Sequence, residues 1–227
     1  VYKIYSKGRQ IGFKLNPTTI LSTKEPELKR DSSQQFTNIA IIGIDTRENS
    51  TLLNTDTIIL ASYNYSTNNT TMISIPRDFH VEVEKGKRFY QRINYIYSYY
   101  EGIEKGTGIP HLIDTIAEIT GQEIQYYAMV DFKAFVQIID SVGGVDVNVE
   151  NSFTDYMYPE GIGYKTVKFV AGPQTMNGKT ALEYSRSRHS MQNNEGSDYA
   201  RARRQQKVIT ALQNKILSSE TLLDPKK

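Results

Sequence analysis

The sequence predicts an α/β fold, a three-layer αβα sandwich with a central mixed β-sheet in a single domain, and three observations support this prediction. The first is a continuous apolar run over residues 38–45, NIAIIGID, which is typical of a strand buried on both faces. Such strands belong to sheets that helices cover on both sides. The second is the alternation of strand and helix patterns along the chain. The third is the length of 227 residues with 38% apolar content, which suffices for the core of one large domain.

Each further element is predicted from its periodicity and from the residues that end it. Strands at 57–63 and 70–75 flank the turn-rich segment NYSTNN, which favours a hairpin. Helix ends are marked by Gly121, a C-cap, and by Asn177 and Ser197, which are N-caps. The predicted elements are, in order, strands at 38–45, 57–63 and 70–75, helices at 93–104 and 110–120, a strand at 124–130, a helix at 132–141, strands at 145–149 and 164–170, a helix through Tyr184 and a last helix to Leu217.

The flanks and the composition limit the classes of function. Residues 1–35 lack apolar periodicity and are predicted to be a linker, the domain proper spans 36–218, and 219–227 form a tail. No stretch reaches the roughly 18 apolar residues of a membrane span, and the first residues lack the apolar region of a signal peptide. The chain has no cysteine and three scattered histidines, which excludes thiol nucleophiles and disfavours a His-rich metal site.

Arginine is concentrated near the C-terminus of a chain whose formal net charge is only +2. Five arginines lie within nineteen residues, with Glu195 and Asp198 among them: Arg186, Arg188, Arg201, Arg203 and Arg204. Because guanidinium groups bind oxyanions in a fixed geometry, the cluster predicts recognition of a specific anion. The alternative is a solvated basic surface.

The last predicted helix gives this anion site a position. Arg201, Arg204 and Gln205 are spaced i, i+3 and i+4 and share one face of its first turns. The positive end of the helix dipole makes arginines unfavourable there, by roughly a few tenths of a kcal/mol, unless an anion binds among them. Arg204 is interpreted as a supporting neighbour, and Arg203, about 100° further round the helix, as solvated.

A second cluster surrounds Arg77 in the segment SIPRD, at the end of a predicted strand. Pro76 removes a backbone donor and ends the strand, so Arg77 lies at the carboxyl edge, where open α/β sheets bind ligands. Asp78 is expected to orient the guanidinium through a bidentate pair. A structural Arg–Asp pair that closes a loop explains the segment equally well.

Two carboxylates complete the candidate site. Asp45 follows the buried strand and Asp56 precedes the next one, so both lie at adjacent strand ends. This arrangement suits Mg²⁺, which takes one or two protein carboxylates and fills its shell with water and phosphate oxygens. The alternative is that both residues form turns. A metal ion and an arginine cluster are complementary halves of a pyrophosphate site, because both neutralise charge during phosphoryl transfer.

Several motifs in series resemble the LytR-CpsA-Psr family of bacterial cell-wall glycopolymer transferases over residues 36–215: NIAIIGIDTR, NTDTI, SIPRD, RINYIY, VDF, DSVGGVDV, MNGKTALEYSRSR and DYARARRQQ. The resemblance implies a catalytic αβα domain outside the cytoplasmic membrane, carried on an N-terminal single-pass anchor upstream of residue 1. It also implies a reaction, the transfer of an anionic glycopolymer such as wall teichoic acid or capsular polysaccharide from an undecaprenyl-pyrophosphate carrier to peptidoglycan. Pyrophosphatase action is an expected side activity.

Carried over by motif, the resemblance assigns Mg²⁺ or Mn²⁺ to Asp45 and Asp56, and the pyrophosphate to Arg77 together with Arg186, Arg188, Arg201 and Gln205. Arg77 and Asp45 are the implied catalytic residues, and the sequence does not select the general base. The chain departs from the family pattern in having Leu53-Asn54-Thr55 before Asp56, where a GRSDT-like stretch with an arginine is common. The loop 189–196 is also long for the family.

Two other classes of function stay open at this point. A non-catalytic binder of anionic cell-wall polymer would grip phosphates with the arginines and use the aspartates for structure. A nucleic-acid-binding domain is disfavoured by the small net charge, by the absence of a recognisable motif and by the carboxylate pair.

Overall fold

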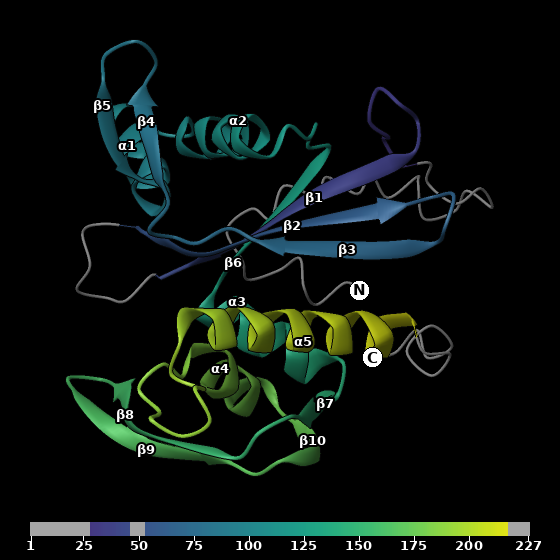
Figure 1. The fold of residues 1–227 in the computed structure, drawn as a ribbon, viewed down its shortest axis with the longest axis vertical. Coiled ribbons are helices and arrows are strands. Elements are labelled where there is room, and N and C mark those ends of the chain that lie inside the picture. Colours follow the sequence, from purple (N-terminus) through teal and green to yellow (C-terminus); the bar gives the residue numbers. More distant parts are fainter. Residues whose placement is uncertain (1–27, 46–52, 218–227) are drawn as a thin grey trace. The chain divides into compact units, whose positions relative to one another are not determined.

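The structure, a computed structural model, describes residues 28–45 and 53–217. These residues form two compact units, divided between Asp131 and Phe132. Each unit combines helices with strands, so the predicted mixed α/β class is confirmed (Figure 1). The predicted linker before residue 28 and the tail at 219–227 lie outside the described residues, and the three layers of the sandwich stay a prediction.

The first unit, residues 28–131, is built on a mixed four-stranded sheet. Its strands are β1 (Phe36–Ile44), β2 (Thr55–Asn64), β3 (Asn69–Ser74) and β6 (Tyr126–Asp131). The strand order is β3-β2-β1-β6, with β1 antiparallel to β2 and parallel to β6, and β2 antiparallel to β3. The central mixed sheet and the hairpin of β2 and β3 are therefore confirmed.

Two helices pack on this sheet through one apolar core. The helix predicted at 93–104 is a 3₁₀ turn, η2 (Ile93–Tyr95), followed by α1 (Ile96–Ile103), and α2 (Gly108–Thr120) comes next. Side chains from both layers meet in a cluster that excludes water: Ala40, Ile42, Ile58, Ile96, Leu112 and Ile116. Burial of this cluster is the main force that holds helices and sheet together.

Local signals set the ends of α2. The helix stops at Gly121, as predicted, where φ is +66° and the backbone N–H donates to the Ala117 carbonyl at 2.8 Å. Glycine adopts this left-handed conformation without steric cost.

A small hairpin of β4 (His80–Glu84) and β5 (Phe89–Arg92) was not among the predicted elements. Its signal is the alternation of buried Val81 and Val83 with the more exposed Glu82 and Glu84, which is the pattern of a half-buried strand. Because only two apolar residues form this alternation, it is too short to predict a strand from the sequence alone.

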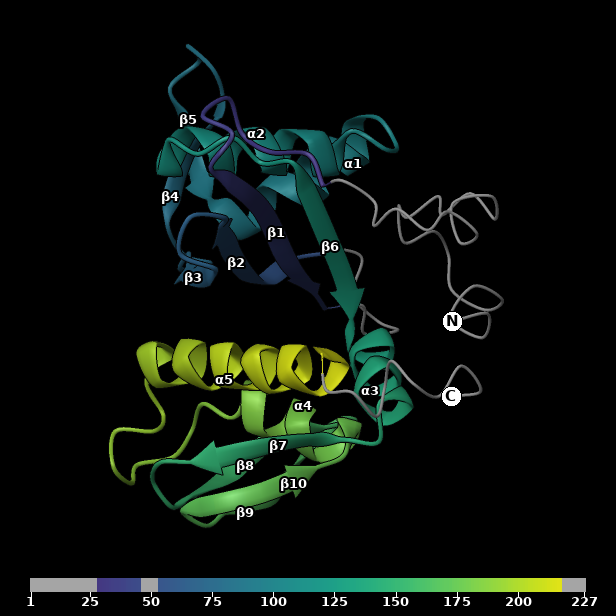
Figure 2. The ribbon, with the colours of Figure 1, turned by 90° about the vertical axis from the view of Figure 1, so that its right-hand side faces the viewer.

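The second unit, residues 132–217, combines three helices with two antiparallel strand pairs. Its elements are α3 (Phe132–Ser141), β7 (Val145–Val149), β8 (Phe153–Glu160), β9 (Gly163–Phe169), β10 (Gly172–Met176), α4 (Gly178–Arg186) and α5 (Asp198–Leu217). The strands pair as β7 with β10 and β8 with β9. Helix α4 contacts both α3 and α5, and α5 also contacts β7 (Figure 2).

Both predicted helix caps of this unit are confirmed. The Asn177 Oδ1 accepts the Thr180 N–H at 2.9 Å, and the Ser197 Oγ accepts the Ala200 N–H at 3.2 Å. Each bond satisfies a backbone donor that the helix start leaves open. The strand predicted at 164–170 is β9, whereas its partner β8 and the strand β10 were not predicted.

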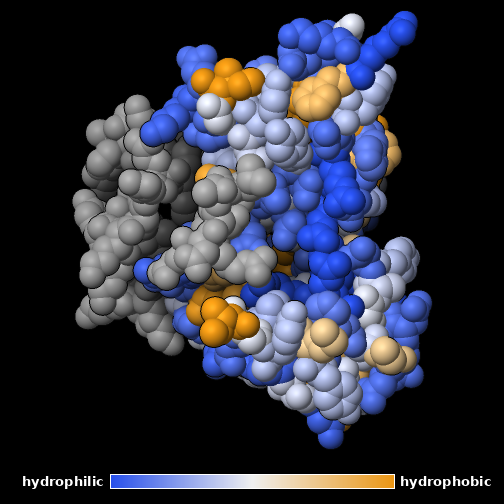
Figure 3. Space-filling view, turned by 90° about the vertical axis from the view of Figure 1, so that its left-hand side faces the viewer, coloured by the Kyte–Doolittle hydropathy of each residue, from blue (hydrophilic) through white to orange (hydrophobic). Residues whose placement is uncertain are grey.

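The described helices lack the features of a membrane-spanning helix. In the ranges 28–45 and 53–217, no helix is both long enough and apolar enough to cross a bilayer. One face of the molecule shows mostly hydrophilic residues, with apolar ones in small separate patches (Figure 3).

Candidate functional site

The two predicted metal-binding aspartates are neighbours at one end of the β1–β2 ladder. Asp45 directly follows β1, and the register pairs Ile44 with Thr55, the residue before Asp56. The ladder shifts register at this point, since Gly43 pairs with Thr57 and leaves Asp56 as an extra residue. Such bulges re-aim side chains beside functional sites. Asp45 is 6% exposed, so its carboxylate lies at the edge of the core.

Arg77 contacts Asp56 directly. Its Nη1 donates to the Asp56 Oδ1 at 2.9 Å, which is a charge-assisted hydrogen bond. The Asp78 Oδ2 lies 3.6 Å from the Arg77 Nε, too long for a hydrogen bond, and Asp78 pairs more closely with the Arg92 Nη1 at 3.1 Å. The predicted partner Asp78 is therefore the weaker one, because Asp56 reaches the guanidinium from the neighbouring strand.

The carboxylates fit a hard divalent cation by their chemistry. Asp45 and Asp56 offer oxygen ligands, and Mg²⁺ or Mn²⁺ needs few protein ligands when phosphate and water complete the shell. Over the described ranges, His, Cys, Asp and Glu side chains form no group of three or more that could hold a metal. A cation here would therefore depend on the two aspartates and on oxygens of a ligand, and it would share Asp56 with Arg77.

In the second unit, Arg186 is fixed by aromatic rings at the end of α4. Its guanidinium carbon lies 3.9 Å above the Phe132 ring centroid, and its Nη1 donates to the Tyr158 hydroxyl at 3.2 Å. Burial raises the pKa of Tyr158, so the phenol stays neutral and accepts this hydrogen bond. A stacked guanidinium keeps its polar edge available for an oxyanion.

Arg188 follows two residues later, in the loop between α4 and α5. Its side chain is exposed, while its backbone N–H donates to the buried Asp155 Oδ2 at 3.0 Å. Of the two predicted ligands, Arg186 is thus held through its side chain and Arg188 through its backbone.

Arg201 and Gln205 lie one turn apart in the first half of α5. The Arg201 Nη2 pairs with the Asp198 Oδ1 at 3.1 Å, and the Arg201 side chain is 12% exposed. Asp198 is the first residue of the helix, where a carboxylate interacts favourably with the helix dipole. The predicted conflict between Arg201 and the dipole is thus partly offset within the chain.

One prediction for α5 is wrong. Arg203 is not merely solvated, since it pairs with Glu150 at 3.0 Å and with Glu195 at 2.8 Å. Arg204, interpreted as a supporting neighbour of the anion site, is 1% exposed and bonds to Glu195 and to backbone carbonyls. The physical reason is Glu195, a buried carboxylate that is stabilised inside the protein by cationic partners.

The buried acids Asp155 and Glu195 are functional candidates that sequence reasoning missed. Asp155 lies in a strand that was not predicted, and Glu195 was considered only as a balancing charge. Their burial depends on tertiary contacts, for which the local sequence gives no signal.

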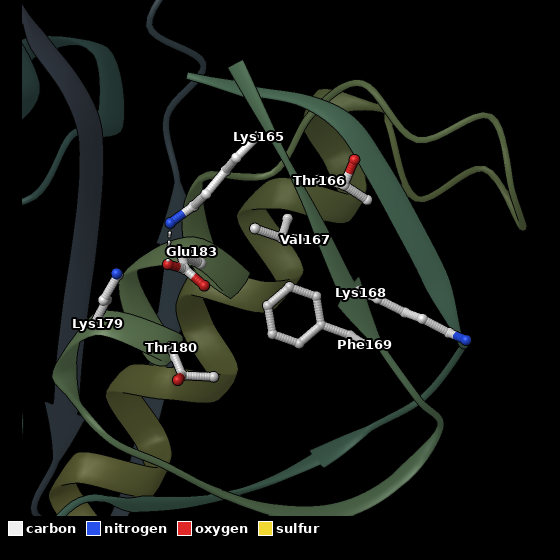
Figure 4. Close-up of a pocket in the computed structure, with 8 residues that line it drawn as sticks. All are labelled: Lys165, Thr166, Val167, Lys168, Phe169, Lys179, Thr180 and Glu183. Carbon is white, nitrogen blue, oxygen red and sulfur yellow. Dashed lines mark hydrogen bonds and ion pairs between the residues drawn. The ribbon is translucent and has the colours of Figure 1, made fainter. Parts of the chain in front are cut away.

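A pocket of about 440 Å³ lies between β9 and α4 (Figure 4). Lys165 reaches into it and pairs with the Glu183 Oε1 at 2.8 Å and with Glu160 at 2.7 Å. None of the predicted site residues is among those that line it, which are Lys165, Thr166, Val167, Lys168, Phe169, Lys179, Thr180 and Glu183.

The mixed sheet and the two groups of side chains define a class: an α/β protein with arginines and carboxylates suited to an anionic ligand. The chain belongs to the LytR-CpsA-Psr family, because the LytR_cpsA_psr family model matches residues 2–227. The family predicted from the motifs is therefore confirmed.

Relatives with known names support this assignment. The chain is 34% identical over 204 residues to the polyisoprenyl-teichoic acid–peptidoglycan teichoic acid transferase TagU of Oceanobacillus iheyensis, covering 87% of this chain and 58% of TagU. The chain therefore spans less than two thirds of this relative.

Solved structures share the fold. TagV of B. subtilis matches with a TM-score of 0.63 at 26% identity, covering 82% of this chain and 66% of TagV. TagT bound to LIIa-WTA matches with a TM-score of 0.63 at 25% identity, covering 88% of this chain and 71% of TagT.

Proposed function

We propose that the chain is a Mg²⁺-dependent phosphotransferase that moves an anionic glycopolymer, wall teichoic acid or capsular polysaccharide, from undecaprenyl pyrophosphate to peptidoglycan. The observation that carries the proposal is the Arg77–Asp56 contact beside Asp45, since it combines a guanidinium with two carboxylates at one strand end. The names of the relatives support it, because TagU is a teichoic acid transferase and TagT is bound to LIIa-WTA.

In the proposed reaction, a hydroxyl oxygen of peptidoglycan attacks the sugar-side phosphorus of the pyrophosphate. The bond from that phosphorus to the bridging oxygen breaks, and undecaprenyl phosphate leaves with the bridging oxygen. The proton of the hydroxyl goes to a base, for which Asp45 is the candidate. Attack by water in place of the acceptor gives the pyrophosphatase side activity.

The arginines neutralise the charge of the pyrophosphate. Arg77 stabilises charge that develops on the phosphoryl oxygens, while Arg186, Arg188, Arg201 and Gln205 bind and orient the ligand. Mg²⁺ or Mn²⁺, held by Asp45 and Asp56, would supply further positive charge to those oxygens.

We extend the proposal to the cellular location. The chain works outside the cytoplasmic membrane as a 36–218 catalytic domain, held by a single-pass N-terminal anchor. The support comes from TagU, whose name gives peptidoglycan as the acceptor, since peptidoglycan lies outside that membrane.

The test is an assay with and without acceptor. The protein and Mg²⁺ are incubated with an undecaprenyl-pyrophosphate-linked teichoic acid precursor, and undecaprenyl phosphate is measured by mass spectrometry. Release that depends on added peptidoglycan supports a transferase, and release without it supports a hydrolase. Absence of release under both conditions would refute the proposed function.

A second function is favoured by one observation, namely that Arg77 and Arg201 already have carboxylate partners in the chain. In a non-catalytic binder of anionic wall polymer the aspartates serve structure, and the pairing of Asp56 with Arg77 fits that role. Polymer binding that does not require Mg²⁺, together with no release of undecaprenyl phosphate, would decide for this alternative.

A further inference from the structure

One peptide unit in the loop between α4 and α5 is held at both ends by buried charged groups. The Arg188 N–H donates to the Asp155 Oδ2 at 3.0 Å. The carbonyl of the same peptide, that of Ser187, accepts a hydrogen bond from the Arg204 Nη2. The negative group therefore holds the N–H and the positive group holds the C=O.

Both charged groups are deep inside the second unit. Asp155 is 0% exposed and also accepts the Met157 N–H at 2.9 Å and the His189 N–H at 3.2 Å. Three backbone donors thus stabilise one carboxylate, and these hydrogen bonds offset the free-energy cost of removing it from water.

The Arg204 guanidinium is equally well satisfied. Its Nε donates to the Tyr184 carbonyl at 2.8 Å, and its Nη1 donates to the Glu195 carbonyl at 2.8 Å and to the Glu195 carboxylate. Burial lowers the pKa of Arg204, and the hydrogen bond to Glu195 opposes this shift. One side chain therefore connects the end of α4, the Ser187 carbonyl and the residues just before α5.

Stability alone gives no reason for this arrangement. A buried ion pair such as that of Arg204 with Glu195 adds little net stability, because desolvation offsets its attraction, and in some proteins such pairs instead fix one geometry of the chain. The geometry selected here is that of the backbone between Arg186 and Arg188. With Arg186 held by Phe132 and Tyr158, the fixed peptide also sets where the Arg188 side chain begins.

We propose that Arg204 and Asp155 are positioning residues, which aim Arg188 at the pyrophosphate by holding the Ser187–Arg188 peptide from both sides. The proposal rests on the proposed function, because it takes Arg188 as a pyrophosphate ligand. Neither residue touches the ligand; each acts through the backbone of Arg188.

The test measures the affinity for undecaprenyl pyrophosphate in detergent with Mg²⁺, by isothermal titration calorimetry. Arg204→Lys keeps the charge but cannot reach several carbonyls at once, and we expect it to weaken binding about tenfold. Asp155→Asn keeps the size but loses the negative charge that accepts backbone N–H groups, with the same expected direction. The matched control is Arg203→Lys, because Arg203 is adjacent to Arg204 on α5 and also pairs with Glu195, but among the described contacts it does not bond to Ser187. The affinity of this variant should stay within about twofold of wild type.

A double-mutant cycle separates positioning from general structure. In an Arg188→Ala background, Arg204→Lys should cause no further loss of affinity, because the residue it positions is absent. Thermal melts of all variants check that the fold is retained, and Asp155→Asn serves if Arg204→Lys does not fold. Losses that add fully to that of Arg188→Ala, in folded proteins, would overturn the positioning role and leave the proposed function intact. Absence of transfer by the wild-type protein is the separate outcome that removes the proposed function.

Discussion

Arg203 and Arg204 are adjacent on α5 and both donate to the carboxylate of Glu195, yet the Arg203 side chain is 36% exposed and the Arg204 side chain 2%. The same carboxylate is therefore shared by one partner at the surface and one in the interior. Since water screens the outer pair and not the inner one, the two arginines should contribute very differently to stability.

Arg204→Ala should destabilise the protein by about 3–5 kcal/mol, because it leaves the buried Glu195 without its inner partner and three backbone carbonyls without their donor. Arg203→Ala should cost no more than about 1 kcal/mol. Urea unfolding followed by circular dichroism measures both. Equal losses for the two variants would contradict this account of Glu195.

Arg77→Ala should lower turnover of the undecaprenyl-pyrophosphate substrate by about 10²–10³-fold, if its guanidinium stabilises charge in the transition state. The matched control is Arg92→Ala, since Arg92 pairs with the neighbouring Asp78 but its side chain is 61% exposed. Initial rates at saturating substrate give the comparison. Near-normal transfer by a folded Arg77→Ala protein would remove Arg77 from the catalytic residues.

Asp45→Asn should weaken the binding of Mn²⁺ at least about tenfold, because it removes one of two charged oxygen ligands. Free Mn²⁺ gives a sharp electron paramagnetic resonance signal, so binding is measured without any turnover. Asp78→Asn is the control, as this carboxylate pairs with Arg92 at 3.1 Å and lies outside the proposed metal site. The metal assignment fails if both variants bind Mn²⁺ as wild type does.

Tyr184 should make stability fall at alkaline pH. Burial raises the pKa of Tyr184 from its ordinary value to about 12. The folded state therefore holds the phenolic proton more tightly than the unfolded state, and this contribution is complete below pH about 10 and is lost between pH about 10 and 12. Tyr184→Phe should show a shallower fall of unfolding free energy over that window. An unchanged slope would show that Tyr184 ionises normally in the folded protein.

Much of the fold could be predicted because its signals are local. The apolar run of β1, the turn between β2 and β3, and the caps at Gly121, Asn177 and Ser197 each need only neighbouring residues, and the structure confirms all of them. The strands β8 and β10 were missed because apolar and polar residues do not alternate along their sequences, FTDYMYPE and GPQTM.

The site was harder to predict than the fold. Helical spacing correctly separates the faces of Arg203 and Arg204, but it does not say which face the protein covers. Arg204 was grouped with Arg201, whereas its partner Glu195 lies in a loop whose path no periodicity describes. Arg77 shows the same limit: its closest carboxylate among the described contacts belongs to β2, 21 residues earlier, and not to the adjacent Asp78.

The register shift beside Gly43 has a consequence for how this protein can change. Because Thr55 and Thr57 already face the residues of β1, Asp56 is surplus to the ladder between the strands. A descendant that lost this one codon would keep an uninterrupted sheet and its buried apolar residues, while the carboxylate beside Arg77 would be gone. The architecture can therefore be inherited without the chemistry proposed for it.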